Sequence, residues 1–148
     1  MNINTNKLEV SVVCGILAGV FSQIFGEWSQ DLFALIIFMG VDFVTGILVA
    51  ILFRKSPKSK NGGLSSKTCW RGIAKKVVTL LMVAVAHQAD IILDAGYLRN
   101  AVVIAFCASE TISIMENASA MGVLPAPVQK IMDKILDMFN NKGGGLSG

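Results

Sequence analysis

Charged residues are scarce in this sequence and unevenly placed. Asp, Glu, Lys and Arg make up 16% of the 148 residues, against about 25% in ordinary soluble domains. Eight of the thirteen Lys and Arg residues lie within residues 54–76, a stretch that contains no acidic residue. A soluble helical bundle would distribute its charges along one face of every helix. The low and segregated charge therefore argues against a soluble domain.

Cysteine and histidine are also scarce. Cys14, Cys69 and Cys107 are widely spaced and form no CxxC pair, which argues against a disulfide framework. A single histidine is too few for a zinc site, and no GxSxG, HExxH or glycine-rich phosphate motif is present. Trp70 is the only aromatic residue within 54–76, which argues against a nucleic-acid site. We therefore predict no enzyme activity, no cofactor, no metal and no nucleic-acid partner.

Apolar residues, in contrast, make up 53% of the sequence and gather in long runs. Four segments are apolar enough to be membrane helices: residues 8–25, 32–53, 73–93 and 98–115. A helix of about 22 residues is about 33 Å long, which exceeds the roughly 30 Å hydrocarbon core of a bilayer. The first and fourth segments are shorter and contain Gln23 and Glu110, so three and four spans both remain open. We predict an all-α integral membrane helical bundle.

The basic stretch predicts the orientation of the bundle. Positively charged loops stay in the cytoplasm, so residues 54–72 should form a cytoplasmic loop, and the turns at 27–31 and 94–97 should face outward. With four spans both termini are cytoplasmic; with three, the N-terminus lies outside. Basic side chains near the membrane should attract anionic lipid. The residues predicted to do so are Arg54, Lys55, Lys58, Lys60, Lys67, Arg71, Lys75 and Lys76.

A different kind of helix is predicted after the apolar segments. Pro125 and Pro127 should end one helix and start another. From Val128 onward the apolar residues recur on one face, which is typical of a helix that binds a membrane surface or a partner helix. We therefore divide the chain into a membrane domain, residues 1–124, and a cytoplasmic part, residues 125–148, that ends in a flexible tail from residue 140.

A few polar residues fall within the apolar segments, where an ionisable group costs roughly 2.5–3.5 kcal/mol or more. Each could form a structural hydrogen bond in a packed bundle or line water once several copies assemble. His87 and Asp90 are three residues apart and could pair, and for them we favour a structural hydrogen bond over a proton relay. The polar-face candidates are Asp42, Thr45, Thr79, His87, Asp90, Glu110, Ser113 and Asn117.

Small residues recur every four positions in two of the segments. Such rows let helix backbones approach closely in lipid, either within one chain or between copies. The helix-packing candidates are Ser11, Gly15, Gly19, Gly46, Ala101, Ala105 and Ser109.

Three stretches of the sequence resemble the toxin-secretion/phage-lysis holin family of small phage and clostridial membrane proteins. They are GVDFVTGILVAI (40–51), LSSKTCWRGIAKKVVTLLMVAVAHQAD (64–90) and ETISIMENASAMGVLPAPVQK (110–130). The resemblance covers most of the chain from Gly40 to about Phe139. The family has no established catalytic residues, so the roles of the polar-face candidates are inferred from the cost of burying them.

The resemblance implies a homo-oligomer in the host cytoplasmic membrane. Holins accumulate there and assemble into lesions that let an endolysin reach the cell wall, without a necessary direct contact between the two proteins. Some clostridial relatives are linked to toxin release. Two other hypotheses remain: a small ion or proton channel or transporter subunit, and an antiholin-like regulator. The implied partners are therefore membrane lipid, other copies of the chain and, functionally, an endolysin.

Overall fold

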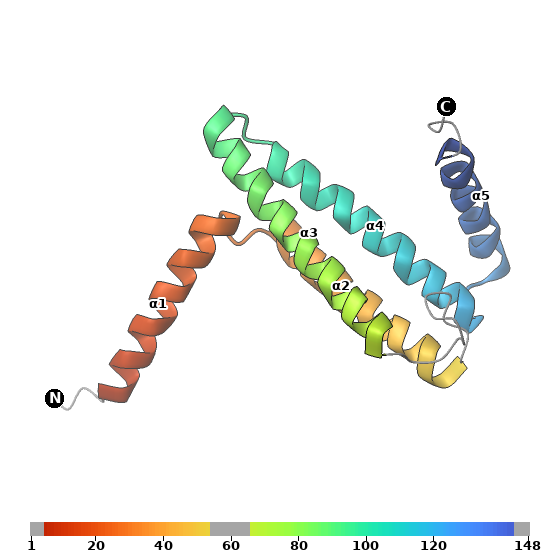
Figure 1. Cartoon of the computed structure of the whole chain (residues 1–148), viewed down its shortest axis with the longest axis horizontal. Helices are drawn as coiled ribbons and strands as arrows, with labels where there is room; N and C mark the ends of the chain where they lie inside the picture. The colour runs from red at the N-terminus through yellow and green to blue at the C-terminus, as the bar shows by residue number, and fades with distance from the viewer. Residues whose placement is uncertain (1–4, 54–65, 144–148) are drawn as a thin grey trace. The chain divides into compact units, whose positions relative to one another are not determined.

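The computed structural model describes residues 5–53 and 66–143, and within these ranges the chain is helical with no strand (Figure 1). The elements are α1 (Thr5–Phe25), α2 (Gln30–Leu48), the π-helical turn η1 (Val49–Phe53), α3 (Ser66–Leu93), α4 (Leu98–Met121) and α5 (Ala126–Gly143). Four of the helices, α1 to α4, are long and apolar enough to cross a membrane. The prediction of an all-α membrane bundle is confirmed.

Three predicted boundaries differ from the structure by four residues or more. Helix α4 continues to Met121, six residues beyond the predicted end at residue 115. Helix α3 begins at Ser66, seven residues before the apolar segment, so Lys67 and Arg71 lie on a helix and not in a loop. Lys and Arg favour helices, and their long stems let the charge reach water, so the helix continues beyond the apolar segment. The remaining basic candidates up to Lys60 lie outside the described residues. Helix α5 runs to Gly143, four residues into the predicted tail.

The helices divide into two compact units. Unit 1 contains α1, the start of α2 up to Ile37, α3 from Ala74 and α4 up to Cys107. Unit 2 contains α2 and η1 from Phe38, the start of α3, α4 from Ala108, and α5. Three helices therefore contribute to both units.

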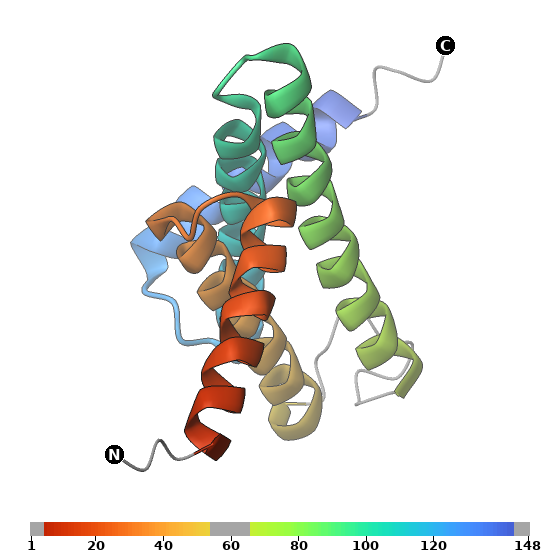
Figure 2. The same ribbon diagram turned by 90° about the vertical axis from the view of Figure 1, so that its left-hand side faces the viewer.

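Helices α1 and α3 are each followed directly by a residue in the left-handed conformation. Gly26, with φ of 80°, follows α1 and donates its amide hydrogen to the Ser22 carbonyl at 2.8 Å. Asp94, with φ of 50°, follows α3, and the next amide, Ala95, donates to the Asp90 carbonyl at 3.2 Å. Asp tolerates this conformation better than most residues. The turn that begins at Asp94 joins α3 and α4 into a hairpin (Figure 1, Figure 2).

The connection from α4 to α5 also follows from local sequence. Gly122, with φ of 73°, ends α4, and the Val123 amide donates to the Ala118 carbonyl at 3.2 Å. The Pro125 carbonyl then accepts the amides of Val128 and Gln129, at 2.9 and 3.0 Å, in the first turn of α5. This pattern of a glycine after one helix and a proline at the start of the next is common.

Few apolar side chains are buried. The fully buried ones are Leu32, Leu35, Val83 and Val103 in unit 1, and Val49 and Met132 in unit 2. None of the apolar window of α1 is buried, and only 17% of the window in α3 and 6% of that in α4 are buried. Water would penalise such exposure at about 25 cal/mol per Å² of apolar surface, whereas hydrocarbon does not. The sparse core therefore fits helices that face lipid.

Candidate functional site

A buried polar cluster joins α2 and α4 inside unit 2, and we call Asp42, Thr45 and Asn117 the Asp42 cluster. The Asn117 side-chain amide donates to Asp42 Oδ1 at 3.1 Å, to the Asp42 carbonyl at 3.3 Å and to Thr45 Oγ1 at 3.0 Å. Asp42 and Asn117 are only 8% and 3% exposed. The carboxylate that was costly to place in the membrane is thus held by a hydrogen-bond donor from another helix.

Thr45 completes the cluster through its own helix. Its hydroxyl lies 2.8 Å from the Val41 carbonyl and 3.1 Å from the Asp42 carbonyl, so it donates back along α2 while its oxygen accepts from Asn117. A Cβ added at Gly46 would lie 3.6 Å from Asn117 Nδ2, an ordinary contact distance. Gly46 therefore lies where α4 packs on α2, but an alanine would fit there.

Three other polar-face candidates lie on α3 and α4, outside the Asp42 cluster. Thr79 is buried within unit 1, and Glu110 and Ser113 are half-buried in unit 2. Three of the predicted polar residues are thus brought together by hydrogen bonds, and these come from two helices, as a shared polar face requires. Whether this face lines water in an assembly stays a prediction.

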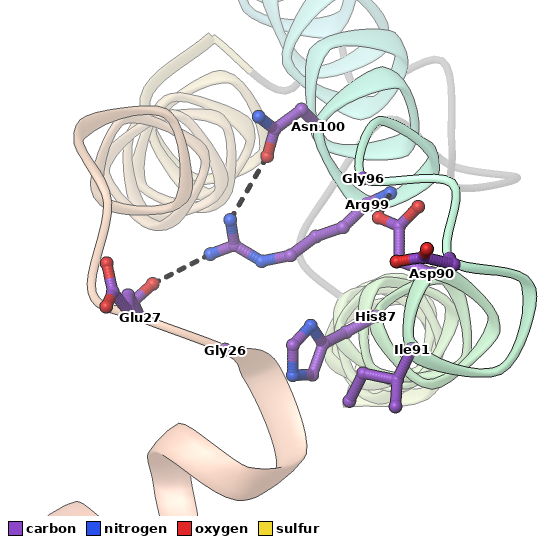
Figure 3. A pocket seen from close by; sticks show the side chains of 9 residues that line it. Gly26, Glu27, His87, Asp90, Ile91, Gly96, Arg99 and Asn100 are labelled. Carbon is purple, nitrogen blue, oxygen red and sulfur yellow. Dashed lines mark hydrogen bonds between the residues drawn. The ribbon is translucent and has the colours of Figure 1, made fainter.

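A second polar site lies in unit 1, where Arg99 binds the turn between α1 and α2. Its Nε donates to the Phe25 carbonyl at 2.6 Å, and its Nη2 donates to the Glu27 carbonyl at 3.0 Å and to Ser29 Oγ at 2.9 Å. Its Nη1 donates to Asn100 Oδ1 at 3.1 Å, and Figure 3 shows the guanidinium between this residue and Glu27. Arg99 is 8% exposed.

These contacts satisfy the end of α1. Phe25 is its last residue, and the last carbonyls of a helix have no partner within the helix. Arg99 takes one of them, and Gln88 Nε2 takes another by donating to the Gln23 carbonyl at 3.0 Å. A cation is also favourable at the negative end of a helix dipole. Arg99 and Gln88 therefore fix the end of α1 to α3 and α4.

Asp90 caps the start of α4, which corrects the predicted pairing with His87. Its Oδ1 accepts the amides of Tyr97 and Leu98 at 3.0 and 2.8 Å, and its Oδ2 accepts that of Arg99 at 2.8 Å. Among the described residues no hydrogen bond joins His87 to Asp90. The first amides of a helix need an acceptor, and the short turn brings them to the carboxylate.

His87 instead packs against Gly26, in the connection between α1 and α2. A Cβ at residue 26 would lie 2.9 Å from His87 Cε1 and 3.4 Å from Arg99 Nε, so only glycine fits there. His87 and Arg99 also line a pocket of about 370 Å³ at this end of unit 1. The other lining residues are Gly26, Glu27, Asp90, Ile91, Asp94, Gly96 and Asn100.

Arg99 was not among the residues predicted from the sequence, although a signal was present. It is the only Lys or Arg between Lys76 and Lys130. It also begins a helix on the side predicted to face outward, where positive charge is disfavoured. A cation that departs from this rule is expected to have a specific partner.

The small-residue rows contact little within one chain. A Cβ at Gly15 or Gly19 would meet nothing within 4 Å. Ser11 is exposed, and its one hydrogen bond to the described residues is donated to the Lys7 carbonyl of its own helix, at 2.8 Å. The α4 row of Ala101, Ala105 and Ser109 is exposed as well. Packing between copies through these rows stays a prediction.

Comparison with known proteins gives a consistent family. Residues 19–141 match the bacteriophage holin family. An uncharacterized protein of Listeria innocua is 35% identical over 140 residues, which cover 93% of this chain and 92% of that protein. A 14.9 kDa protein of Clostridium perfringens is 35% identical over 128 residues, covering 85% and 89%. A probable holin of Bacillus phage phi105 is 34% identical over 90 residues, covering 60% and 61%.

No solved structure shows a significant match to the chain. The family match nevertheless covers the greater part of the sequence, from within α1 to within α5. It agrees with the four apolar helices and with the resemblance noted from the sequence. The chain is a multi-pass membrane protein and belongs to the bacteriophage holin family.

Proposed function

We propose that the protein is a holin that oligomerises in the bacterial cytoplasmic membrane and opens lesions through which an endolysin or a toxin leaves the cell. The observation that carries this proposal is the family match over residues 19–141, together with the similarity to a probable phage holin. Family membership also supports a non-enzymatic role, in which the endolysin supplies the chemistry that degrades the cell wall.

The proposed orientation places the basic stretch 54–72 in the cytoplasm and both termini on the same side. The turns at 26–29 and 94–97 then face outward. The Arg99 contacts support this arrangement, because they join residues of the first turn to the start of α4, just after the second turn. Two turns that are hydrogen-bonded in this way must lie on the same side of the membrane.

The Asp42 cluster suggests how a closed chain differs from an open assembly. In the single chain, Asn117 donates to Asp42 between α2 and α4, and both side chains are buried. An ionisable group at this depth costs roughly 2.5–3.5 kcal/mol, and contact with water in an assembly would remove much of that cost. We therefore propose that α2 and α4 separate when the lesion opens, so that Asp42 exchanges Asn117 for water.

The experiment that tests the function is expression in a bacterium that also produces a cytoplasmic endolysin. Abrupt lysis after a delay, with loss of membrane potential, supports a holin. An ion-specific leak that spares the cells supports a channel instead. Delayed lysis by a co-expressed holin supports an antiholin. A culture that lacks the endolysin is the control, because there the membrane should be permeabilised while the cell wall stays intact.

The contribution of Asp42 is tested in the same culture by Asp42→Asn. Asparagine keeps the shape and one acceptor oxygen but removes the charge, so the time of lysis should shift. Gln129→Ala is the matched control, because Gln129 is exposed, lies in the same unit and belongs to neither the polar-face nor the helix-packing candidates. Unchanged timing at equal protein level would exclude a role for the carboxylate.

A further inference from the structure

Helix α5 has an apolar surface that its own unit covers only in part. Met132 is fully buried, and Val128 and Ile135 are half-buried. Ile131 and Met138 are 59% and 60% exposed. Because they are seven residues apart, they lie above one another on the helix, next to the covered line of Val128 and Ile135. We call Ile131 and Met138 the exposed apolar edge of α5.

The charged residues of α5 are arranged with respect to this edge. Lys134 is three residues after Ile131 and four before Met138, so it borders both. Lys130 is one turn earlier in the same row. Asp133 and Asp137 form a row farther around the helix, beyond the lysines. All four charged side chains are exposed. The apolar edge is therefore bordered by cations and not by anions.

The position of α5 in the chain keeps it close to the membrane. Helix α4 is long and apolar enough to span the bilayer and ends at Met121, and α5 begins at Ala126. The five Cα–Cα steps between them reach at most about 19 Å. The first turn of α5 must therefore lie within reach of the lipid headgroups at that end of α4.

We propose that the exposed apolar edge of α5 docks on the anionic surface of the same membrane that the other helices cross. Ile131 and Met138 would enter the boundary between headgroups and acyl chains, and Lys130 and Lys134 would reach the lipid phosphates. Asp133 and Asp137 face away from the negative surface. The inference needs only that the chain spans a membrane, and it is independent of lesion formation.

A second copy of α5 is a less suitable partner for the exposed apolar edge than the membrane surface. It would present the same lysine row beside the same apolar edge, and no acidic row borders that edge in either copy. Like charges brought together in this way oppose pairing. An anionic lipid surface, in contrast, offers a phosphate to every lysine.

The test uses the full-length protein with Cys14, Cys69 and Cys107 replaced, reconstituted into phosphatidylcholine vesicles with or without phosphatidylglycerol. Met138→Cys carries an environment-sensitive fluorophore, and Gln129→Cys, exposed on the opposite side of α5, is the matched control. Lipids with a spin label on the acyl chain quench only fluorophores that enter the membrane. We expect quenching at position 138 and not at 129, and stronger quenching with the anionic lipid.

Removing the lysines should weaken docking without unfolding the bundle, because both are exposed. Each Lys→Gln change at 130 or 134 should lower the ratio of docked to undocked α5 about fivefold in anionic vesicles. Higher salt should have the same direction of effect. Equal quenching at 138 and 129 would overturn the proposal. The fluorophore at position 138 could instead report an apolar environment that depends on the ratio of protein to lipid and not on lipid charge. That result would overturn the proposal in favour of a second copy.

Discussion

The hydrogen bond between Asn117 and Asp42 can be measured with a double-mutant cycle of Asn117→Ala, Asp42→Ala and the double variant. The backbone carbonyl of Asp42 and the Thr45 hydroxyl remain as acceptors when the Asp42 side chain is removed. The coupling free energy therefore isolates the 3.1 Å contact with Asp42 Oδ1. Both side chains are buried, so water cannot easily replace either partner.

The expected magnitude depends on the charge of Asp42. A hydrogen bond to a charged group contributes about 1.5–3 kcal/mol. Side-chain hydrogen bonds between membrane helices average only about 0.6 kcal/mol, with a maximum near 1.7. We expect a coupling of about 2 kcal/mol, because the amide donates to a carboxylate that is nearly excluded from solvent. A value near 0.6 kcal/mol would mean that the contact is no stronger than an average hydrogen bond between membrane helices.

The assay is reversible unfolding of the purified full-length protein in mixed micelles, followed by loss of helical signal as denaturing detergent is added. Ser109→Ala, an exposed change in the same unit, should alter the unfolding free energy by less than about 0.5 kcal/mol. A coupling within about 0.3 kcal/mol of zero would refute the reasoning, since it would mean that the folded protein does not form the contact between α2 and α4.

Further predictions concern the Arg99 contacts in unit 1. Gly26→Ala should lower the unfolding free energy by about 1 kcal/mol or more beyond the effect of Gly96→Ala, because both positions have positive φ but only a Cβ at 26 meets His87. His87→Ala should recover that excess in the double variant, and failure to do so would locate the strain elsewhere. Arg99→Lys should cost about 1–3 kcal/mol, because one ammonium cannot match the guanidinium geometry toward Phe25, Glu27 and Ser29. Amide exchange at Gly26 should accelerate in that variant but not in Arg71→Gln, an exposed control.

The sequence was sufficient to predict the helices where hydropathy changes abruptly. Helix α3 ends at Leu93 and α4 begins at Leu98, as predicted, because polar and glycine residues separate two apolar runs. The start of α3 could not be predicted in this way. Basic residues are compatible with both a loop and a helix, so the boundary at Ser66 depends on propensity and not on hydropathy.

The polar contacts were only partly predictable, because spacing along one helix does not identify partners on another. The i, i+3 spacing of Thr45 from Asp42 predicts that they share one face of α2. Their common partner Asn117 follows only from how α4 packs. The spacing of His87 and Asp90 gave the wrong partner, since the amides that begin α4 compete for the carboxylate. These amides lie seven to nine residues later and are brought back only by the turn.

Two substitutions at the same hydrogen bond should affect lysis in opposite directions if the Asp42 cluster separates during lesion opening. Asn117→Ala removes the donor and keeps the charge, so the closed chain loses stability and lysis should come earlier. Asp42→Asn removes the charge and keeps an acceptor for Asn117, so the closed chain keeps its hydrogen bond. Contact with water stabilises a neutral amide less than a carboxylate, so the open assembly gains less. Lysis should therefore come later. A cluster that only stabilises the fold cannot produce this reversal. Its loss would change the amount of folded protein in both variants. At equal protein level the two lysis times would then not shift in opposite directions from that of the unchanged protein.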